Sequence, residues 1–289
     1  MVLCWRCERI PSWYSLFLTD CDPVQKKGVL SVTINWYPGH MVKAKKEIQE
    51  NIKLVDIVAL LLDARAPFSC RNPDLEKLAR HKQLLLVLNK MDLAQPEVTR
   101  IYLARLKEAG LAAVAMDSVS GKGMLEVIQS IKTLYHPLAE VMLQKGRRVR
   151  PVRVMVVGVP NIGKSTFLNC LVNKKMARTG AKPGITRGKQ WVRVRDDIEL
   201  MDTPGLMWPK IENEEQGLKL ALLNIVGENA YQEYEVALYL LRILQQKAPL
   251  LLSDKLKVND PDESPAELLT KIARQRGHLL KGGKLDLEK

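Results

Sequence analysis

The chain has 289 residues, 46% of them hydrophobic, which is enough for two domains with packed cores. No apolar run approaches the ~18 residues of a membrane span or forms a signal peptide, so we expect a soluble, cytoplasmic protein. The formal net charge of +13 favours a polyanionic partner, nucleic acid before an anionic membrane surface, with a merely basic soluble protein as the alternative.

Residues 1–32 differ from the rest of the chain. They mix Trp, Cys, Pro and charged residues without a sustained period, and they hold three of the five cysteines. Cys4 and Cys7 form a C-x-x-C, but no second pair follows at zinc-site spacing, so free thiols in a reducing cytosol are expected. We predict a poorly ordered N-terminal extension. Alternatively, the working protein begins near Val32.

The next part of the chain alternates helical and strand patterns. Lysines spaced along one face predict a helix, and near-continuous apolar runs that end in polar residues predict buried parallel strands. A further helix is predicted after the third strand. These elements are expected at residues 42–52 (helix), 55–62, 84–88 and 112–116 (strands), and 123–135 (helix). The alternation predicts an α/β fold with a doubly wound, mostly parallel sheet.

Two polar segments follow the second and third strands and predict recognition of guanine. The Asp92 carboxylate in Asn89-Lys90-Met91-Asp92 can accept two hydrogen bonds from the N1–H and N2 groups, which adenine does not offer. Asn89 would tie the loop to its surroundings, Lys90 would lie along the ring, and Ser118 would belong to a loop near the guanine oxygen. By itself, the first segment could equally be a polar turn.

A phosphate-binding loop is predicted at residues 158–165, between an apolar run at 152–157 and a helical pattern. Its glycines let successive backbone N–H groups point at a phosphate, and the following helix N-terminus adds partial positive charge. Lys164 would reach the β- and γ-phosphates, and Ser165 would ligate Mg²⁺. The predicted nucleotide-binding residues here are Gly158, Asn161, Ile162, Gly163, Lys164, Ser165 and Thr166. A Gly-containing strand-to-helix turn is the alternative.

Further Mg²⁺ and phosphate contacts are predicted downstream of this loop. Thr186 suits a Mg²⁺ contact, and strands at 190–194 and 198–201 lead to Asp202-Thr-Pro-Gly205. Asp202 would support the Mg²⁺, and the Gly205 N–H would sense a γ-phosphate.

Beyond about residue 212, strand patterns end and helical spacing dominates. Ser264-Pro265-Ala-Glu267 predicts a capping box that starts a helix ending near residue 275. The sequence therefore predicts three parts: the extension at 1–32, an α/β domain at 33–211 and an all-helical domain at 212–289.

With these motifs together, the chain resembles the translation-factor-type GTPases, but with the motif order permuted. The base-binding elements at Asn89 and Ser118 precede the phosphate loop, Thr186 and Asp202. With Trp36-Tyr-Pro-Gly-His40 in front, the set is similar to the circularly permuted GTPases, and most similar to the bacterial ribosome biogenesis GTPase A family. The resemblance covers residues 34–289. It implies a GTP-dependent factor in late assembly of the large ribosomal subunit, with a helical domain that contacts ribosomal RNA.

The resemblance also implies specific roles and departures. Leu206 stands where Ras-like enzymes place a glutamine that orients water, so slow intrinsic turnover and stimulation by a partner are expected. His40 is implied as the compensating catalytic group, with a structural histidine as the alternative. Asn161 is implied as a K⁺ ligand, or else it only stabilises its loop. The chain stops soon after residue 282, where family members commonly continue, which puts RNA affinity in doubt.

The sequence thus predicts a monomeric GTPase that uses GTP, Mg²⁺ and K⁺, with His40, Lys164 and Thr186 in catalysis. Its expected partner is the precursor of the large ribosomal subunit, through ribosomal RNA and proteins. One alternative is a GTPase in another RNA process such as tRNA modification, and another is an RNA-binding scaffold that holds GTP structurally. A mitochondrial relative stays open, although Glu8, Asp20 and Asp22 suit a transit peptide poorly.

Overall fold

The computed structural model describes residues 39–172, 190–207, 211, 213–227, 231–257, 263–278 and 285–287. The predicted extension at 1–32, with its C-x-x-C, lies outside these residues. The described chain divides into two compact units, one before residue 209 and one after it.

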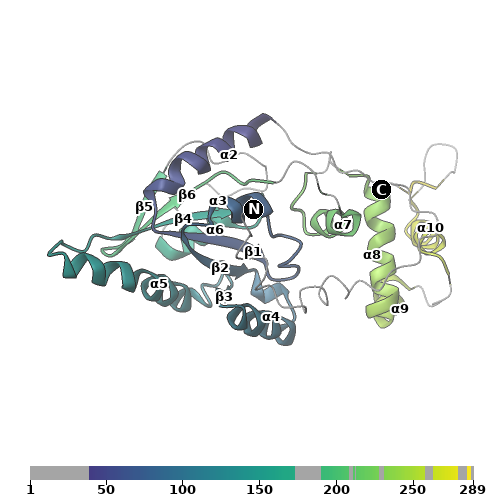
Figure 1. Ribbon diagram of the computed structural model, residues 1–289. Coiled ribbons are helices and arrows are strands. Elements are labelled where there is room, and N and C mark those ends of the chain that lie inside the picture. Colours follow the sequence, from purple (N-terminus) through teal and green to yellow (C-terminus); the bar gives the residue numbers. More distant parts are fainter. Residues whose placement is uncertain are drawn as a thin grey trace, which may run out of the picture. The chain divides into compact units, whose positions relative to one another are not determined.

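The first unit is built on a six-stranded sheet with the order β3-β2-β1-β4-β6-β5 (Figure 1). Neighbouring strands are parallel except β5, which runs antiparallel to β6 at one edge. The strands are β1 (Ile57–Asp63), β2 (Gln83–Asn89), β3 (Ala112–Met116), β4 (Val152–Gly158), β5 (Gln190–Arg195) and β6 (Ile198–Asp202). The sequence analysis predicted five of these strands, and an apolar run before the phosphate loop corresponds to β4. The predicted ends of all six differ from the observed ends by at most two residues.

Helices in the first unit connect and cover the strands. They are α2 (Gly39–Asn51), α3 (Pro73–Leu78), α4 (Pro96–Glu108), α5 (Met124–Gln144) and α6 (Lys164–Val172), with short 3₁₀ turns η1 (Ile52–Leu54) and η2 (Met91–Leu93). Helix α5 packs along β1, β2 and β3, whereas α6 packs along β4, β5 and β6.

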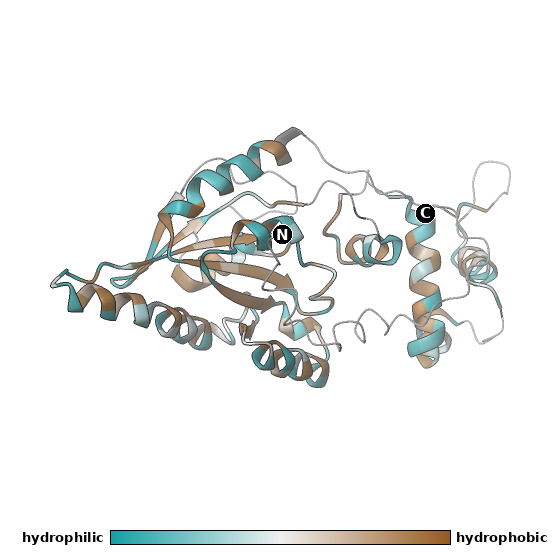
Figure 2. Ribbon diagram, in the orientation of Figure 1, coloured by the Kyte–Doolittle hydropathy of each residue, from teal (hydrophilic) through white to brown (hydrophobic). Residues whose placement is uncertain are grey.

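The centre of the sheet is apolar, as the strand patterns predict. Every residue of β1 is buried, and so are the last five residues of β2 and of β4. Figure 2 shows these strands in the apolar colour, whereas the helices carry hydrophilic stretches. A parallel strand covered on both faces needs such a run, because neither side meets water.

Helix α5 is longer than predicted. The sequence places its end near Tyr135, just before Pro137, but the helix continues to Gln144. Proline removes one backbone hydrogen bond. The helix nevertheless holds on both sides of Pro137, since the Tyr135 hydroxyl donates to the Arg150 carbonyl at 3.0 Å and lies 3.9 Å from the Met142 sulfur.

The second unit is helical in its described part. Its helices are α7 (Glu214–Leu222), α8 (Glu233–Lys247), α9 (Pro249–Leu256) and α10 (Pro265–Gln275). Leu241, Leu252 and Leu268 form a small core that joins α8, α9 and α10. The predicted capping box is confirmed, because the Glu267 N–H donates to Ser264 and the Glu267 carboxylate accepts from the Ser264 N–H.

The predicted fold class is therefore confirmed: a mostly parallel α/β sheet is followed by helices. Within the described ranges, no helix is both long and apolar enough to cross a membrane.

Candidate functional site

The carboxyl ends of four strands, three of which end in polar residues, lie at one end of the sheet. In the parallel register, Asp63 of β1 lies beside Asn89 of β2, and Leu61 of β1 lies beside Gly158 of β4. Asp202 ends β6 on the other side of β4. In open α/β sheets, ligands bind at this end.

The predicted phosphate loop connects β4 to α6. Asn161 and Gly163 have positive φ angles of 54° and 98°, which turn successive N–H groups toward one side. A side chain is not tolerated at two of its glycines: a Cβ at Gly163 would lie 2.6 Å from the Asn89 amide nitrogen, and one at Gly158 would lie 2.9 Å from the Leu61 carbonyl oxygen. Ile162 is fully buried beneath the loop.

Lys164 is buried at the start of α6. Its ammonium group donates to the carbonyl oxygens of Val159 at 3.0 Å and Gly158 at 3.3 Å. Burial lowers the pKa of Lys164 to about 8, although the charge of Asp202 acts in the opposite direction. The loop thus contains a desolvated cation that an anionic ligand would stabilise. Ser165 and Thr166 follow in the first turn of α6 and are half-buried.

Asn89 joins three of the predicted nucleotide-binding segments. Its side-chain nitrogen donates to the Ile162 carbonyl of the phosphate loop at 2.9 Å. Its side-chain oxygen accepts from the Ser118 hydroxyl at 2.7 Å and from the Ser118 N–H at 3.3 Å. A single buried amide therefore fixes the distance between the base-binding loops and the phosphate loop.

Lys90 links the same segments at the surface. It has a left-handed backbone with φ of 59°, and its ammonium group donates to the Asn161 carbonyl at 3.1 Å. Asp92 lies two residues further on, in η2, with its side chain exposed. A ligand can therefore reach the Asp92 carboxylate.

Asp63 belongs to this site, although the sequence indicated only that a strand ends there. Its buried carboxylate accepts two hydrogen bonds from the Arg65 guanidinium and one from the Arg65 N–H, and it lies 3.2 Å from the Lys90 ammonium nitrogen. Burial raises the pKa of Asp63, but the Arg65 hydrogen bond and the charge of Lys90 outweigh it and hold the pKa below its ordinary value. Asp63 therefore stays ionised and holds Lys90.

The segment after β6 lies against the phosphate loop. A Cβ at Gly205 would lie 2.8 Å from the Pro160 Cα, so only glycine allows this approach. The Thr203 hydroxyl donates to the Val156 carbonyl at 2.6 Å, and the Leu206 N–H donates to the Gly158 carbonyl at 3.1 Å. The buried Asp202 carboxylate is thereby held beside Lys164.

Two other polar residues that the sequence analysis did not assign support the site. Asn72 caps α3 and also donates to the Leu206 carbonyl at 2.8 Å. Asp117 accepts from the backbone N–H groups of Val119 and Ser120, which shapes the loop around Ser118. The Asn72-Pro73 pair is a recognisable helix start, but its contact with a residue 134 positions away has no local signal.

The structure thus brings together most of the predicted residues. One group comprises Asn89, Lys90, Ser118, Gly158, Asn161, Ile162, Gly163, Lys164, Asp202 and Gly205. Thr186 lies outside the described residues, and for His40 only its backbone, in the first turn of α2, is described.

Comparisons with known proteins agree with this arrangement. A family model described as 50S ribosome-binding GTPase matches residues 153–276. Ribosome biogenesis GTPase A of Priestia megaterium is 42% identical over 259 residues, which cover 89% of this chain and 90% of that protein. Mitochondrial ribosome-associated GTPase 1 of Mus musculus is 39% identical over 237 residues, covering 78% of this chain and 70% of that protein.

A solved structure agrees in the fold. The crystal structure of GNP-bound YlqF from T. maritima has a TM-score of 0.57 and 26% sequence identity, and the match covers 85% of this chain and 88% of that one. With the relatives above, these matches extend over both described units. The chain belongs to the ribosome biogenesis GTPase A family.

Proposed function

We propose that this protein is a GTP-hydrolysing switch that binds the precursor of the large ribosomal subunit in its GTP state and acts in late subunit assembly. The observation that supports the proposal is the position of Asn89, whose hydrogen bonds to Ile162 and Ser118 hold the segments proposed to bind the base at a fixed distance from the loop proposed to bind the phosphates. The names of the relatives support the ribosomal part. We assign the switch to residues 33–211 and RNA binding to 212–289.

The proposed reaction is in-line attack of water on the GTP γ-phosphate. Lys164 and the N–H groups of the phosphate loop would stabilise the charge that develops on the phosphoryl oxygens. Asp92 would select guanine, because a carboxylate pairs with its two donors and adenine lacks them. Lys90, held by Asp63, would lie along the base.

Mg²⁺ fits the donor set of the site. Ser165 and Asp202 offer a hydroxyl and a carboxylate, the hard oxygen ligands that Mg²⁺ prefers, near the ammonium group of Lys164. We propose these two residues and Thr186 for the ion, which would neutralise phosphate charge. We further propose that the Asn161 side chain is a ligand of K⁺. If activity is retained after K⁺ is replaced by Na⁺, this assignment is wrong.

Slow unassisted turnover is proposed because of Leu206. Its side chain is apolar and 1% exposed, so it cannot orient the attacking water. We propose His40 for this role and the ribosomal subunit as the partner that completes the catalytic arrangement. The same leucine keeps the GTP-holding scaffold as a second candidate.

Co-sedimentation and turnover test these proposals together. The protein is sedimented with purified large ribosomal subunits at one fixed salt concentration, with a GTP analogue, GDP or no nucleotide. Tight binding only with the analogue, and GTP turnover that rises on addition of subunits, support the switch. His40→Ala should remove the rise while nucleotide affinity changes little. If the protein binds the subunits equally well in all three nucleotide conditions and its GTP turnover does not rise, the scaffold is supported instead.

A further inference from the structure

The segment between α5 and β4 contains a concentrated positive charge. Five of the residues 145–153 are Lys or Arg, and none is Asp or Glu. These five are Lys145, Arg147, Arg148, Arg150 and Arg153. The candidate nucleotide site does not use this segment.

Two of the five cations fix the segment to the sheet. The Arg150 guanidinium makes two hydrogen bonds to the Asp56 carboxylate, at 2.8 and 2.7 Å, and Asp56 also accepts from the Arg153 N–H at 2.9 Å. The Arg153 side chain pairs with Glu199 at 3.1 Å. Together with the bond from the Tyr135 hydroxyl to the Arg150 carbonyl, these contacts hold the backbone in one place.

The other three cations, Lys145, Arg147 and Arg148, face solvent. Their side chains are exposed and form no hydrogen bond or ion pair with any residue that the structure describes. Anchoring of the neighbouring residues presents them on a rigid backbone, so less conformational entropy is lost when a partner binds.

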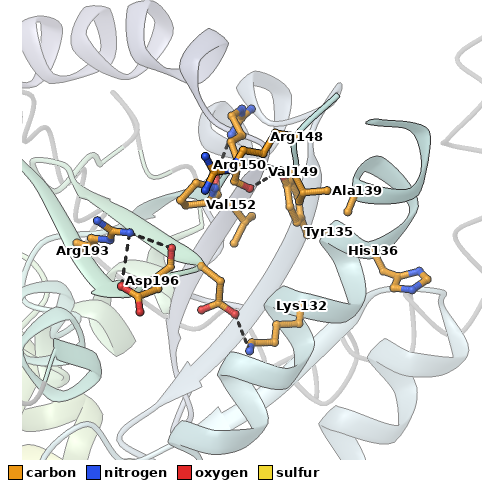
Figure 3. A pocket seen from close by; sticks show the side chains of 12 residues that line it. Lys132, Tyr135, His136, Ala139, Arg148, Val149, Arg150, Val152, Arg193 and Asp196 are labelled. Carbon is orange, nitrogen blue, oxygen red and sulfur yellow. Dashed lines mark hydrogen bonds and ion pairs between the residues drawn. The ribbon is translucent and has the colours of Figure 1, made fainter. Parts of the chain in front are cut away.

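A cavity of about 670 Å³ lies beside Arg148, between α5 and the β5–β6 hairpin (Figure 3). It contains acidic as well as basic groups, and the acidic ones are already compensated. Asp197 pairs with Lys132 at 2.6 Å, and Asp196 lies 3.5 Å from Arg193. His136 lies 3.7 Å from Glu140. The cavity is thus concave and balanced in charge, whereas its rim at Arg148 and the adjoining segment carry uncompensated positive charge.

This surface lies at the end of the sheet where β4 begins, and the phosphate loop lies at the end where β4 finishes. Strand β4 begins at Val152, directly after the basic segment, and ends at Gly158. At ~3.3 Å per residue, the strand separates the two sites by about 20 Å. A partner that binds the basic segment can therefore do so without blocking the nucleotide site.

We infer that Lys145, Arg147 and Arg148, with the adjoining cavity, bind the phosphodiester backbone of ribosomal RNA on the large subunit. This inference rests on the proposed function and adds a contact in the first unit. Charge that continues over several residues beyond the cavity suits a chain of phosphates better than one small anion. Lysine and arginine side chains are the usual phosphate contacts in RNA-binding proteins.

A matched pair of triple variants tests the inference. The first, Lys145→Gln with Arg147→Gln and Arg148→Gln, removes three charges from the basic segment. The control, Arg80→Gln with Arg100→Gln and Lys107→Gln, removes three exposed charges that have no ion pair among the described residues, near α3 and on α4. Dissociation constants for purified large subunits, and for protein-free rRNA of that subunit, are measured at several KCl concentrations with the GTP analogue present.

The first variant should bind both probes about tenfold more weakly. The magnitude of the slope of log K against log salt should also fall by about two to three, because a protein with three fewer phosphate contacts releases fewer counterions on binding. The control variant should stay close to wild type, and both should keep wild-type GDP affinity. Equal losses in the two variants would overturn the inference and leave the proposed function intact. A loss on subunits but not on protein-free rRNA would also overturn it, in favour of a ribosomal protein. If the wild type binds neither probe, the proposed function itself fails.

Discussion

Asp63 shows how a buried charge can serve the nucleotide site without touching the nucleotide. Its carboxylate holds both Arg65 and Lys90, and Lys90 in turn contacts the phosphate loop at Asn161. Removal of one partner from a buried network leaves the other polar groups unsatisfied, which is more costly than the net contribution of the bond.

Asp63→Asn should therefore weaken GDP and GTP binding by about tenfold, which corresponds to ~1.4 kcal/mol, because Lys90 loses its anionic partner. A fluorescent nucleotide titration measures this change. Asp56→Asn is the control, since it removes a carboxylate that pairs with Arg150 at the opposite end of β1 from Asp63. If Asp63→Asn folds normally and binds nucleotide as tightly as the wild type, Asp63 does not position Lys90.

The burial of Lys164 leads us to predict that nucleotide affinity depends on pH. Because burial lowers its pKa to about 8, its ammonium form loses its proton in the free protein as the pH rises through that value. A bound polyphosphate favours the charged form, so binding above this pH takes up a proton, and affinity should fall by up to about tenfold per pH unit.

Calorimetric titrations of GDP in two buffers with different ionisation enthalpies measure this proton uptake directly. Lys164→Arg, which stays charged, should show no such pH dependence whatever its absolute affinity. An affinity of the wild type that is constant from about pH 7 to about pH 9 would contradict the assignment.

At the level of single residues, the sequence predicts the site only where a motif is local. The residues of the phosphate loop follow each other along the chain, so their spacing alone predicts their joint role. Asp63 and Asn72 act on residues far away in sequence, Lys90 and Leu206, and neither contact has a local signal. The bond between Asn89 and Ile162 likewise depends on the order of β2, β1 and β4 in the sheet.

At the level of elements, the start of α10 is fixed by reciprocal hydrogen bonds. The Ser264 hydroxyl accepts from the Glu267 N–H at 3.3 Å, and the Glu267 carboxylate accepts from the Ser264 N–H at 2.9 Å. Helix α10 contributes the fully buried Leu268 to the core of the second unit. Fraying of the first turn would therefore expose that core.

Ser264→Ala should destabilise α10 by about 1 kcal/mol, because an N-terminal N–H loses its acceptor. Hydrogen exchange of the α10 amides should become about fivefold faster. Ser253→Ala in α9 is the matched control, since that hydroxyl donates to the Leu250 carbonyl within its own helix and does not cap it. If the two variants exchange at the same rate, the cap does not limit opening of the helix.

Elements with strong local patterns were the most predictable. The strand predicted at 112–116 coincides with β3, and the capping box marked the start of α10 correctly. The predicted end of α5 was wrong, because Pro137 is a local signal for termination, whereas the hydrogen bond of Tyr135 that accompanies the longer helix reaches Arg150, beyond the helix. The strand predicted at 190–194 coincides with most of β5, but its antiparallel direction has no local signal, since the pairing with β6 decides it.

At the level of the whole molecule, the order of the motifs has a mechanical consequence. The base-binding loops come first in the chain and the Gly205 segment comes last, so the segment that contacts the phosphate loop leads directly toward the helical unit. A change of order in that segment on hydrolysis could thus reach the second unit through the backbone alone.

Limited proteolysis tests this coupling. Residues 205–214 should be cut more slowly with a GTP analogue than with GDP, because a γ-phosphate contact at Gly205 would stabilise the segment. Cleavage is followed by mass spectrometry of the fragments, and the rate at residues 145–151 serves as the internal reference. Equal rates in the two nucleotide states would contradict the coupling.

Leu206 determines where such a change can begin. Its N–H is bound to the Gly158 carbonyl and its own carbonyl to the Asn72 side chain, so both of its peptide groups are clamped to the first unit. A change of order in this segment must therefore either begin after Leu206 or first break these two hydrogen bonds. The leucine that leaves the site without a water-orienting glutamine is therefore also the residue whose main chain ties this segment to the phosphate loop and to the start of α3.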